Sequence, residues 1–170
     1  MIALTVGHTW DGAPVGADEA VTLRLELRRD ALVIEVDAPF HGDPAPSAPA
    51  GPTWALWEHE VVELFLLGPG QRYLEIELGP HGHHLVLQLE GVRNIVARER
   101  PARFQARVSG GRWTGEAQVD RALLPEGPLR ANAVAMHGQG EARRYLASAP
   151  MPGERPDFHR LEYYFDIQLQ

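Results

Sequence analysis

The sequence predicts an all-β protein built as a two-sheet antiparallel sandwich. Apolar and polar residues alternate in several segments, Gly and Pro separate these segments, and only one short stretch has helical character. With 170 residues, of which 44% are hydrophobic and 23% charged, the chain has the size and composition of one globular domain. We therefore expect a single β-sandwich domain over residues 1–170.

Two hairpins are the clearest elements. Residues 21–28 alternate strictly, and residues 32–37 do so again after a turn at Arg29-Asp30. Residues 73–78 and 84–89 repeat this pattern around the turn-forming sequence Gly79-Pro80-His81-Gly82. Alternation places one face of each strand in the core, so the polar residues between them fall on the other face.

The remaining strands are predicted from denser or weaker patterns. The apolar run 61–67 suits a central strand that is covered on both sides. A short helical segment is expected at 120–124, with Asp120 as its N-cap. Further strands are expected at 104–108, 113–119, 132–136, 144–147 and 161–169.

A proline-rich segment interrupts the strands between residues 39 and 53, where five prolines occur. Proline fixes φ and lacks a backbone donor, so this segment is predicted to be a long surface loop. Loops of this length in compact domains are often functional.

Composition excludes several classes of function. The net charge of −7 disfavours nucleic acid as a partner, because an acidic surface repels phosphates. The absence of Cys excludes disulfides, thiolate nucleophiles and Cys-ligated zinc. No apolar stretch approaches about 20 residues and the N-terminus does not resemble a signal peptide, so we expect no membrane association and a cytoplasmic location. Neither a Gly-x-Ser-x-Gly elbow nor a P-loop is present, and the sequence makes no prediction of oligomeric state.

The segment 54–63 carries the strongest candidate for binding chemistry. Trp54 and Trp57 stand near several acidic residues, a combination that suits sugars, because indole packs on a pyranose face while carboxylates accept hydrogen bonds from hydroxyls. Either Trp could instead be part of the core. On an extended strand Glu58 and Glu60 share one face, where they would serve acid–base hydrolysis, hold Ca²⁺, or form a solvated edge.

Histidines form a second group of candidates. His81, His83 and His84 crowd one turn, and imidazole is a ligand for Zn²⁺, Cu²⁺ or Ni²⁺. Within a strand, however, His83 and His84 point to opposite faces, and no His-Glu-x-x-His motif occurs. We therefore predict neither a bound metal nor a cofactor. Near the C-terminus, Asp157, His159 and Arg160 could converge on a ligand or fasten a loop, while Phe158 is expected in the core.

Several motifs resemble family-9 carbohydrate-binding modules and the related DOMON-like domains. They are 57–66, 73–77 and 157–159. The whole chain also resembles a family of small bacterial and animal proteins, and the matching stretches are 8–12, 56–65, 73–89 and 156–164. The resemblance implies an antiparallel β-sandwich with a binding site on loops at one end or face. In the sugar-binding modules a pair of Trp residues clamps the sugar, and Trp57 lies in the matching region.

We therefore predict a binding domain for a small polar ligand, which could be carbohydrate-like. The residues expected to line its site are Trp10, Trp57, Glu60, His81, His137 and His159. One alternative is a metal- or carboxylate-dependent enzyme that uses Glu60 or Glu77 with His83 or His159. Others are a haem-binding domain with ligands among Met136, His137 and Met151, and a protein-interaction module that uses an edge strand or the proline-rich loop.

Overall fold

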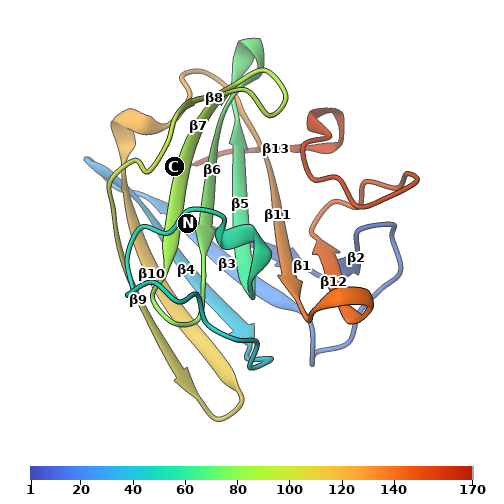
Figure 1. Cartoon of the computed structure of the whole chain (residues 1–170). Helices are drawn as coiled ribbons and strands as arrows, with labels where there is room; N and C mark the ends of the chain where they lie inside the picture. The colour runs from blue at the N-terminus through green and yellow to red at the C-terminus, as the bar shows by residue number, and fades with distance from the viewer. Residues whose placement is uncertain (170) are drawn as a thin grey trace.

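Two antiparallel sheets packed face to face form the protein, as Figure 1 shows. The computed structural model describes residues 1–169. The five-stranded sheet has the order β1-β3-β4-β10-β9, with bounds Ile2–Val6, Val21–Leu27, Ala31–Pro39, Arg112–Asp120 and Ala102–Ser109. The predicted all-β sandwich is confirmed.

The second sheet has eight strands and carries the features that matter for function. Its path β2-β12-β11-β5-β6-β7-β8 has the bounds His8–Thr9, Arg144–Ala147, Leu129–His137, Val61–Leu67, Arg72–Leu78, His84–Glu90 and Ile95–Ala97. Strand β13 (Phe165–Ile167) pairs with β11 beside this path. Five 3-10 turns connect strands: η1 Leu56–Glu58, η2 Pro69–Gln71, η3 Arg121–Leu123, η4 Gly140–Ala142 and η5 Leu161–Tyr163. None of the helical segments in residues 1–169 has the length and apolar character needed to span a bilayer.

Both predicted hairpins are present, as β3–β4 and β6–β7. The weaker strand predictions fall within β9, β10, β11 and β12, whereas the segment 161–169 begins with η5 and only then forms the short strand β13. The predicted N-cap is also present, since the Asp120 carboxylate accepts a 2.8 Å hydrogen bond from the Ala122 backbone N–H at the start of η3. Strands β1, β2 and β8 were not predicted.

The main core lies between the two sheets. Leu23, Leu25 and Ile34 from the five-stranded sheet face Leu64 and Ile76 from the other, and all are fully buried. Each such side chain contributes about 1.5–3 kcal/mol by leaving water. The largest fully buried side chain is that of Trp113 on β10, which belongs to this core.

The eight-stranded sheet is buried on its other face as well. We call this the outer face, because it points away from the five-stranded sheet. A second apolar cluster on it includes Phe65 from β5 and Leu87 from β7. Two segments pack over the cluster: η1, through Leu56, and residues 151–164, which contribute Met151, Phe158, Leu161 and Tyr164. We call η1 and residues 151–164 the covering segments.

The covering segments change the environment of the polar residues on β6. Alternation predicted that Glu75 and Glu77 lie on the face away from the core, but they are only 4% and 0% exposed. The side-chain alternation itself is correct. What the pattern could not indicate is that chain from distant parts of the sequence buries the polar face too.

Residues 40–55 form no helix or strand, and this loop lies along the eight-stranded sheet. Glu60 holds its beginning, accepting hydrogen bonds from the backbone N–H groups of His41 (2.9 Å) and Asp43 (3.1 Å). Its end pairs with β7, where the Thr53 N–H donates to the His84 carbonyl at 2.9 Å. The loop is therefore fastened at both ends.

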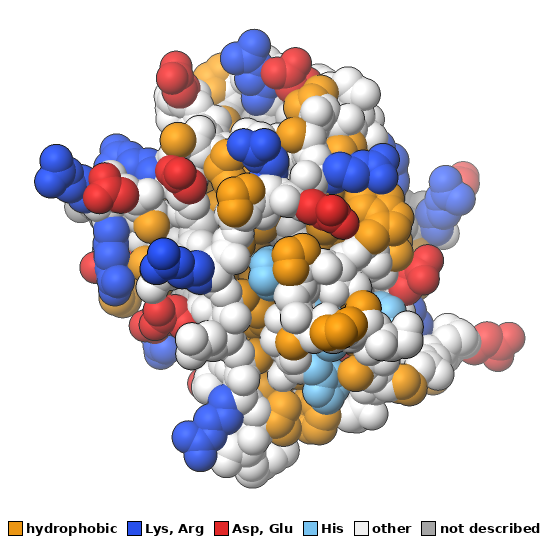
Figure 2. All heavy atoms as spheres, turned by 60° about the vertical axis from the view of Figure 1, so that its left-hand side comes forward, with side chains coloured by type: hydrophobic (Ala, Val, Ile, Leu, Met, Phe, Trp, Pro, Cys, Tyr) orange, Lys and Arg blue, Asp and Glu red, His pale blue; other side chains and the backbone are white. Residues whose placement is uncertain are grey.

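On the face shown in Figure 2, basic and acidic side chains are interspersed, with histidines among apolar groups.

Candidate functional site

A pocket of about 590 Å³ opens on the outer face of the eight-stranded sheet. The sheet contributes Glu63 from β5, Glu75 from β6, Leu87 and Leu89 from β7, and Met136 from β11. The remaining lining residues come from β8, β12, the covering segments and neighbouring connections: Trp57, Glu58, Arg93, Ile95, Arg143, Tyr145, Pro156, Asp157, Phe158 and His159. The volume falls within the range of about 300–1,000 Å³ that is typical of small-ligand sites.

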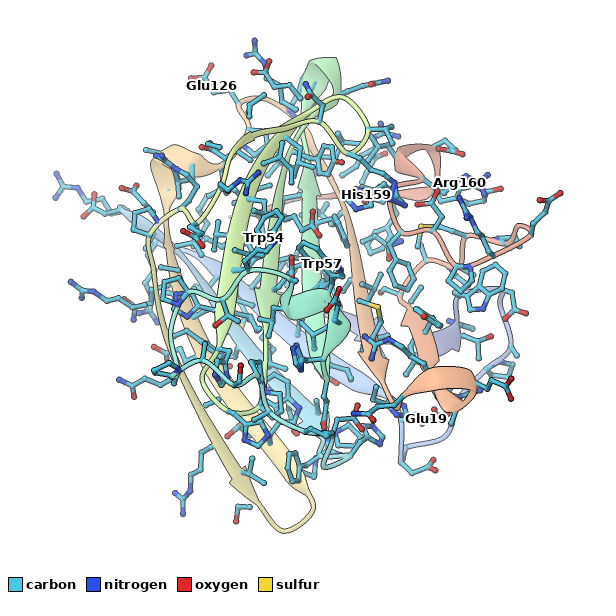
Figure 3. All side chains as sticks on the ribbon, in the orientation of Figure 1. Glu19, Trp54, Trp57, Glu126, His159 and Arg160 are labelled. Atoms are coloured by element: carbon cyan, nitrogen blue, oxygen red, sulfur yellow. The ribbon has the colours of Figure 1, made fainter. Side chains whose placement is uncertain are left out.

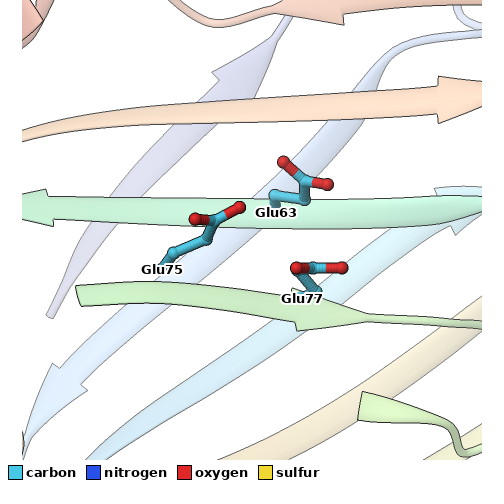
Figure 4. Close-up of side chains that lie close together, drawn as sticks. All are labelled: Glu63, Glu75 and Glu77. Atoms are coloured by element: carbon cyan, nitrogen blue, oxygen red, sulfur yellow. The ribbon is translucent and has the colours of Figure 1, made fainter. Parts of the chain in front are cut away.

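Three glutamates on β5 and β6 lie close together, as Figure 4 shows, and two of them line this pocket. Glu63 and Glu77 are direct partners across the β5–β6 ladder, and Glu75 lies two residues before Glu77 on the same face of β6. One carboxylate oxygen of each residue lies within 4.8 Å of the others. Glu63 and Glu75 line the pocket, whereas Glu77 lies behind them. We call this group the glutamate triad.

Burial changes the acidity of all three carboxyls. Loss of hydration raises the pKa of Glu75 to about 7 and raises the pKa of Glu63 and of Glu77 well above the ordinary value, and the charge of neighbouring carboxylates adds to the rise at Glu63 and Glu77. The positive charges of Arg143 and Arg93 oppose the rise at Glu63 and Glu75, and the Trp57 backbone amide opposes it at Glu77.

Hydrogen bonds within the protein do not compensate for the loss of hydration at these carboxyls. Within residues 1–169, Oε1 of Glu63 and both carboxylate oxygens of Glu77 have no hydrogen-bond partner of normal geometry. A buried carboxylate without donors destabilises the fold, because it loses its hydrogen bonds to water and forms none with the protein. The triad therefore has unused capacity to accept hydrogen bonds or to bind a cation.

Arg143 fastens the covering segment η1 beside the pocket. Its guanidinium donates to the backbone carbonyls of Trp57 (2.6 Å), His59 (3.0 Å) and Gly138 (3.0 Å). These bonds hold a cation near Glu63 without forming an ion pair with it. Arg143 thus positions Trp57 at the pocket and contributes a positive field there.

A second network holds the C-terminal side of the pocket. The Tyr73 hydroxyl accepts a 3.0 Å hydrogen bond from the Arg93 backbone N–H and lies 2.8 Å from Nδ1 of His159. Burial raises the pKa of Tyr73 to about 12 and lowers the pKa of His159 to about 4, so the phenol keeps its proton and the imidazole is neutral at pH 7. We assign the phenol as donor to Nδ1, which leaves the imidazole proton on Nε2.

Asp157 extends the same network towards solvent. Its Oδ1 accepts hydrogen bonds from the Arg93 guanidinium at 2.6 Å and from the His159 backbone N–H at 3.0 Å. The Arg93 charge and these hydrogen bonds hold the pKa of Asp157 below its usual value, against the effect of burial. Of the three residues that could converge on a ligand, Asp157 and His159 line the pocket, whereas the Arg160 guanidinium binds Glu162 and the Pro152 carbonyl instead.

Aromatic side chains form much of the pocket wall and its mouth. Trp57 lies edge-to-face with Trp54, with ring centroids 5.0 Å apart, and the Arg98 guanidinium lies 4.3 Å above the Trp54 ring. Trp54 is 42% exposed. Tyr145 and Phe158 form another contact, with centroids 6.3 Å apart. Both line the pocket and supply apolar surface opposite its polar groups.

Of the six residues predicted to bind a ligand, Trp57 and His159 line the pocket. Figure 3 shows them on the same side of the eight-stranded sheet, one from η1 and the other from the segment before η5. They are separated by about a hundred residues in sequence, and the covering segments bring them to one site.

The other four predicted residues lie away from the pocket. Glu60 holds the proline-rich loop, and His137 stacks on His41 at a centroid distance of 3.4 Å while its Nε2 lies 3.1 Å from Glu19. His81 packs edge-to-face on Phe40. Trp10 packs against the second apolar cluster. A ligand role for these four residues stays a prediction.

One local expectation was wrong. Glu58 and Glu60 do not share a strand face, because η1 ends at Glu58 and the chain turns before β5, leaving Glu58 exposed and Glu60 buried. The histidines of the β6–β7 turn diverge, in agreement with the expectation that His83 and His84 point to opposite faces: Nε2 of His83 lies 2.8 Å from the Ala48 carbonyl, and His84 packs on Phe104. In the described part of the chain, the glutamate triad is the one group of three or more His, Cys, Asp or Glu side chains with ligand atoms within 4.8 Å of one another.

Sequence reasoning missed Glu63 and Glu75 as site residues, and it also missed Arg93 and Arg143. A signal for Glu63 was present, because it is the one charged residue in the apolar run 61–67, which was predicted to be covered on both sides. A charged residue in such a strand must have a buried partner or a functional reason. No comparable local pattern marks the two arginines, which reach the pocket from turns.

Solved structures with the same fold include carbohydrate-binding proteins. A candidate carbohydrate-binding protein from Bacteroides uniformis superposes with a TM-score of 0.73 at 14% identity, covering 88% of this chain and 78% of that one. A family-9 carbohydrate-binding module from Caldicellulosiruptor kristjanssonii, in complex with cellotriose, gives a TM-score of 0.53 at 11% identity, covering 79% and 68%. At these identities the likeness establishes the fold alone.

Relatives of much higher identity occur in vertebrates. The UPF0462 protein C4orf33 homolog of Danio rerio is 41% identical over 174 aligned residues, which cover 97% of this chain and 88% of the relative. The corresponding Mus musculus protein is 43% identical over 169 residues, covering 94% and 87%. No family model matches the chain. Identity at this level over nearly the full length of both partners shows that the chain belongs to the UPF0462 family of C4orf33 proteins.

Proposed function

We propose that the protein is a binding domain for a small polyhydroxylated ligand, of the size of a mono- or disaccharide, and that this ligand lies in the pocket on the outer face. The observation that carries the proposal is the pair Glu63 and Glu75, two buried carboxylates that line an open pocket. Hydroxyl groups donate hydrogen bonds, and a carboxylate in a partly dry site accepts them strongly.

The pocket wall supports the same ligand class. Trp57, Tyr145 and Phe158 offer apolar ring surface, and such surface packs against the C–H faces of a sugar. Arg93, Asp157 and His159 add donors and acceptors at the C-terminal side. A ligand with alternating C–H and O–H groups matches this distribution better than a purely apolar or a highly anionic one.

The fold comparisons are consistent with this proposal. Protein structures of the same architecture hold cellotriose or glucose. Their low identity gives them no weight for individual residues, so the proposal depends on the pocket of this chain. Glucose and cellotriose are nevertheless reasonable first probes.

Isothermal titration calorimetry tests the proposal with D-glucose, cellobiose, cellotriose and myo-inositol. We expect one of these to bind with a 1:1 stoichiometry. Trp57→Ala should weaken that binding by about tenfold through loss of ring contact, and Glu63→Gln should weaken it by a similar factor through loss of a charged acceptor.

Matched controls come from residues outside the pocket. Trp10→Ala removes another partly buried indole that packs against the same apolar cluster, and Glu35→Gln changes an exposed glutamate on the five-stranded sheet. Neither control should alter affinity. Absence of binding to the whole panel by folded protein would refute the carbohydrate proposal, and equal losses in Trp57→Ala and Trp10→Ala would place the site elsewhere.

A further inference from the structure

The glutamate triad includes one residue that hydroxyl recognition does not explain. Glu77 is fully buried behind the pocket-lining Glu63 and Glu75. Neither of its carboxylate oxygens has a hydrogen-bond partner of normal geometry in residues 1–169, although the Trp57 backbone amide is near enough to lower its pKa. Its side chain points towards the other two carboxylates, as Figure 4 shows. Glu77 does not line the pocket, so hydrogen bonding to a pocket ligand does not account for it.

Electrostatics specifies the sign of a partner that binds all three carboxyls in their ionised form. Two unit charges about 4 Å apart repel by about 4 kcal/mol even at an effective dielectric constant of about 20. Three carboxylate oxygens lie within 4.8 Å of one another in the triad. None of the three residues takes part in the ion pairs found among the described residues. Arg93 pairs with Asp157 and Arg143 binds backbone carbonyls, so neither neutralises the triad by direct contact.

Geometry and donor chemistry narrow the choice of cation further. Ca²⁺ binds oxygen at about 2.3–2.6 Å, so oxygens on opposite sides of the ion lie about 5 Å apart and adjacent ones lie closer. The three carboxylate oxygens meet this requirement without rearrangement. All three ligands are carboxylates, which select the hard ions Ca²⁺, Mg²⁺ and Mn²⁺ over ions that prefer imidazole or thiolate.

The backbone holds these ligands in place. Glu63 and Glu77 are paired across two central strands, and Glu75 follows the same pleat, so the three side chains leave the sheet in parallel. The strands have fixed register on both sides, with β11 beyond β5 and β7 beyond β6. Ligands on adjacent strands of a sheet are more rigid than ligands on loops.

We propose that Glu63, Glu75 and Glu77 bind one divalent cation of the Ca²⁺, Mg²⁺ or Mn²⁺ class, with the remaining coordination positions of the ion directed into the pocket. In a second step, which rests on the proposed function, a hydroxyl oxygen of the pocket ligand occupies one of those positions. The triad thereby joins a cation site to the floor of the ligand site.

The cation site is tested with metal ions alone. Protein purified without an affinity tag and treated with chelator is titrated with CaCl₂, MgCl₂ and MnCl₂ by calorimetry, and Mn²⁺ binding is followed by electron paramagnetic resonance. We expect one ion per chain. Glu77→Gln and Glu63→Gln, which keep the side-chain shape and remove the charge, should each weaken binding by at least about tenfold.

Controls keep this test falsifiable if one variant is poorly folded. Circular dichroism verifies the fold of each protein, and the cation should raise the melting temperature of the wild type but not of the folded Glu→Gln variants. Glu35→Gln, on the five-stranded sheet, should bind like the wild type. The proposal is overturned if folded wild type binds none of the three ions, or if both triad variants bind them unchanged.

The link between cation and ligand is tested separately. Titration with the sugar that binds best is repeated with the cation and with excess chelator. Loss of affinity of tenfold or more in chelator supports direct coordination. Equal affinity in both conditions overturns that second step while leaving the cation site intact, and cation binding without any sugar binding refutes the proposed function alone.

Discussion

The two faces of the eight-stranded sheet are both buried, but by different means. The inner face packs against another sheet through apolar side chains such as Leu64, Leu66 and Ile76. The outer face is covered by loops and 3-10 turns, and three glutamates lie among its apolar residues. Regular sheet packing leaves little space on the inner face, whereas irregular chain on the outer face leaves a pocket.

Polar contacts fasten the cover of the outer face. Asn132 on β11 forms two hydrogen bonds with Ala149, one from its amide group to the carbonyl (2.9 Å) and one from the backbone N–H to its side-chain oxygen (3.0 Å). The Tyr164 hydroxyl donates to the Phe158 carbonyl at 2.8 Å. Such bonds fix the position of a segment without filling the volume beneath it. The outer face therefore combines order with empty space.

The inner face should be the more sensitive to loss of volume. Leu64→Ala should lower the free energy of unfolding by about 3 kcal/mol, because a fully buried side chain is replaced by a cavity between two rigid sheets. Urea denaturation measures the change. Val96→Ala, at a 54% exposed position on β8, should change stability by about 0.5 kcal/mol or less. Equal effects at the two positions would contradict the assignment of the inner face as the main core.

The outer face should add a pH dependence through His159. Its pKa falls from 6.5 in the unfolded chain to about 4 in the folded protein, so the unfolded state takes up the proton first as the pH drops. The contribution of His159 to stability should therefore be constant above about pH 6.5 and should decrease between about pH 6.5 and 4, by no more than about 3 kcal/mol.

The variant His159→Gln isolates this contribution from that of the buried glutamates, which remain in both proteins. Unfolding free energies are measured at pH 4, 5, 6 and 7. The free energy of the wild type minus that of the variant should decrease as the pH drops, because the opposite pH dependence of the buried glutamates is common to both proteins. Parallel curves would show that His159 is accessible to protons in the folded state.

Removing the hydrogen bonds that fasten the covering segment 151–164 should lower the free energy of unfolding by less than truncating a core leucine does. Asn132→Ala leaves the N–H and C=O of Ala149 without their partners, which should cost about 2 kcal/mol and increase hydrogen exchange in residues 149–164. Asn94→Ala, which removes an exposed bond to the Glu90 carbonyl, should cost about 1 kcal/mol or less. Unchanged exchange in the covering segment would show that Asn132 does not fasten it.

The smallest predicted effect is a gain in stability, whereas the preceding alanine substitutions lower stability. In excess chelator at pH 8, Glu77→Met should raise the free energy of unfolding by about 1 kcal/mol, because an apolar side chain of similar size replaces a buried, unpartnered carboxyl. Glu35→Met, at an exposed position, should change stability by about 0.5 kcal/mol or less. A loss of stability in Glu77→Met would show that the protein itself satisfies this carboxyl.

The same contrast explains what the sequence could and could not predict. The inner face follows from period-two alternation, which is local, so the β3–β4 and β6–β7 hairpins and the buried strand β5 were predicted correctly. The outer face depends on contacts such as Tyr73 with His159, 86 residues apart, which no local pattern encodes. Trp57 and His159 were found because their residue types suit binding. Glu75 was missed because its alternation is also that of a solvent-facing residue.

The distribution of tryptophan gives the protein its own optical reporter. Trp113 lies in the dry core between the sheets, whereas Trp54 and Trp57 lie on the side of the pocket. Water-soluble quenchers should therefore reach the emission of the second group and spare that of Trp113. A molecule that enters the pocket will alter one part of the fluorescence spectrum, while the shielded indole supplies an internal reference in the same cuvette.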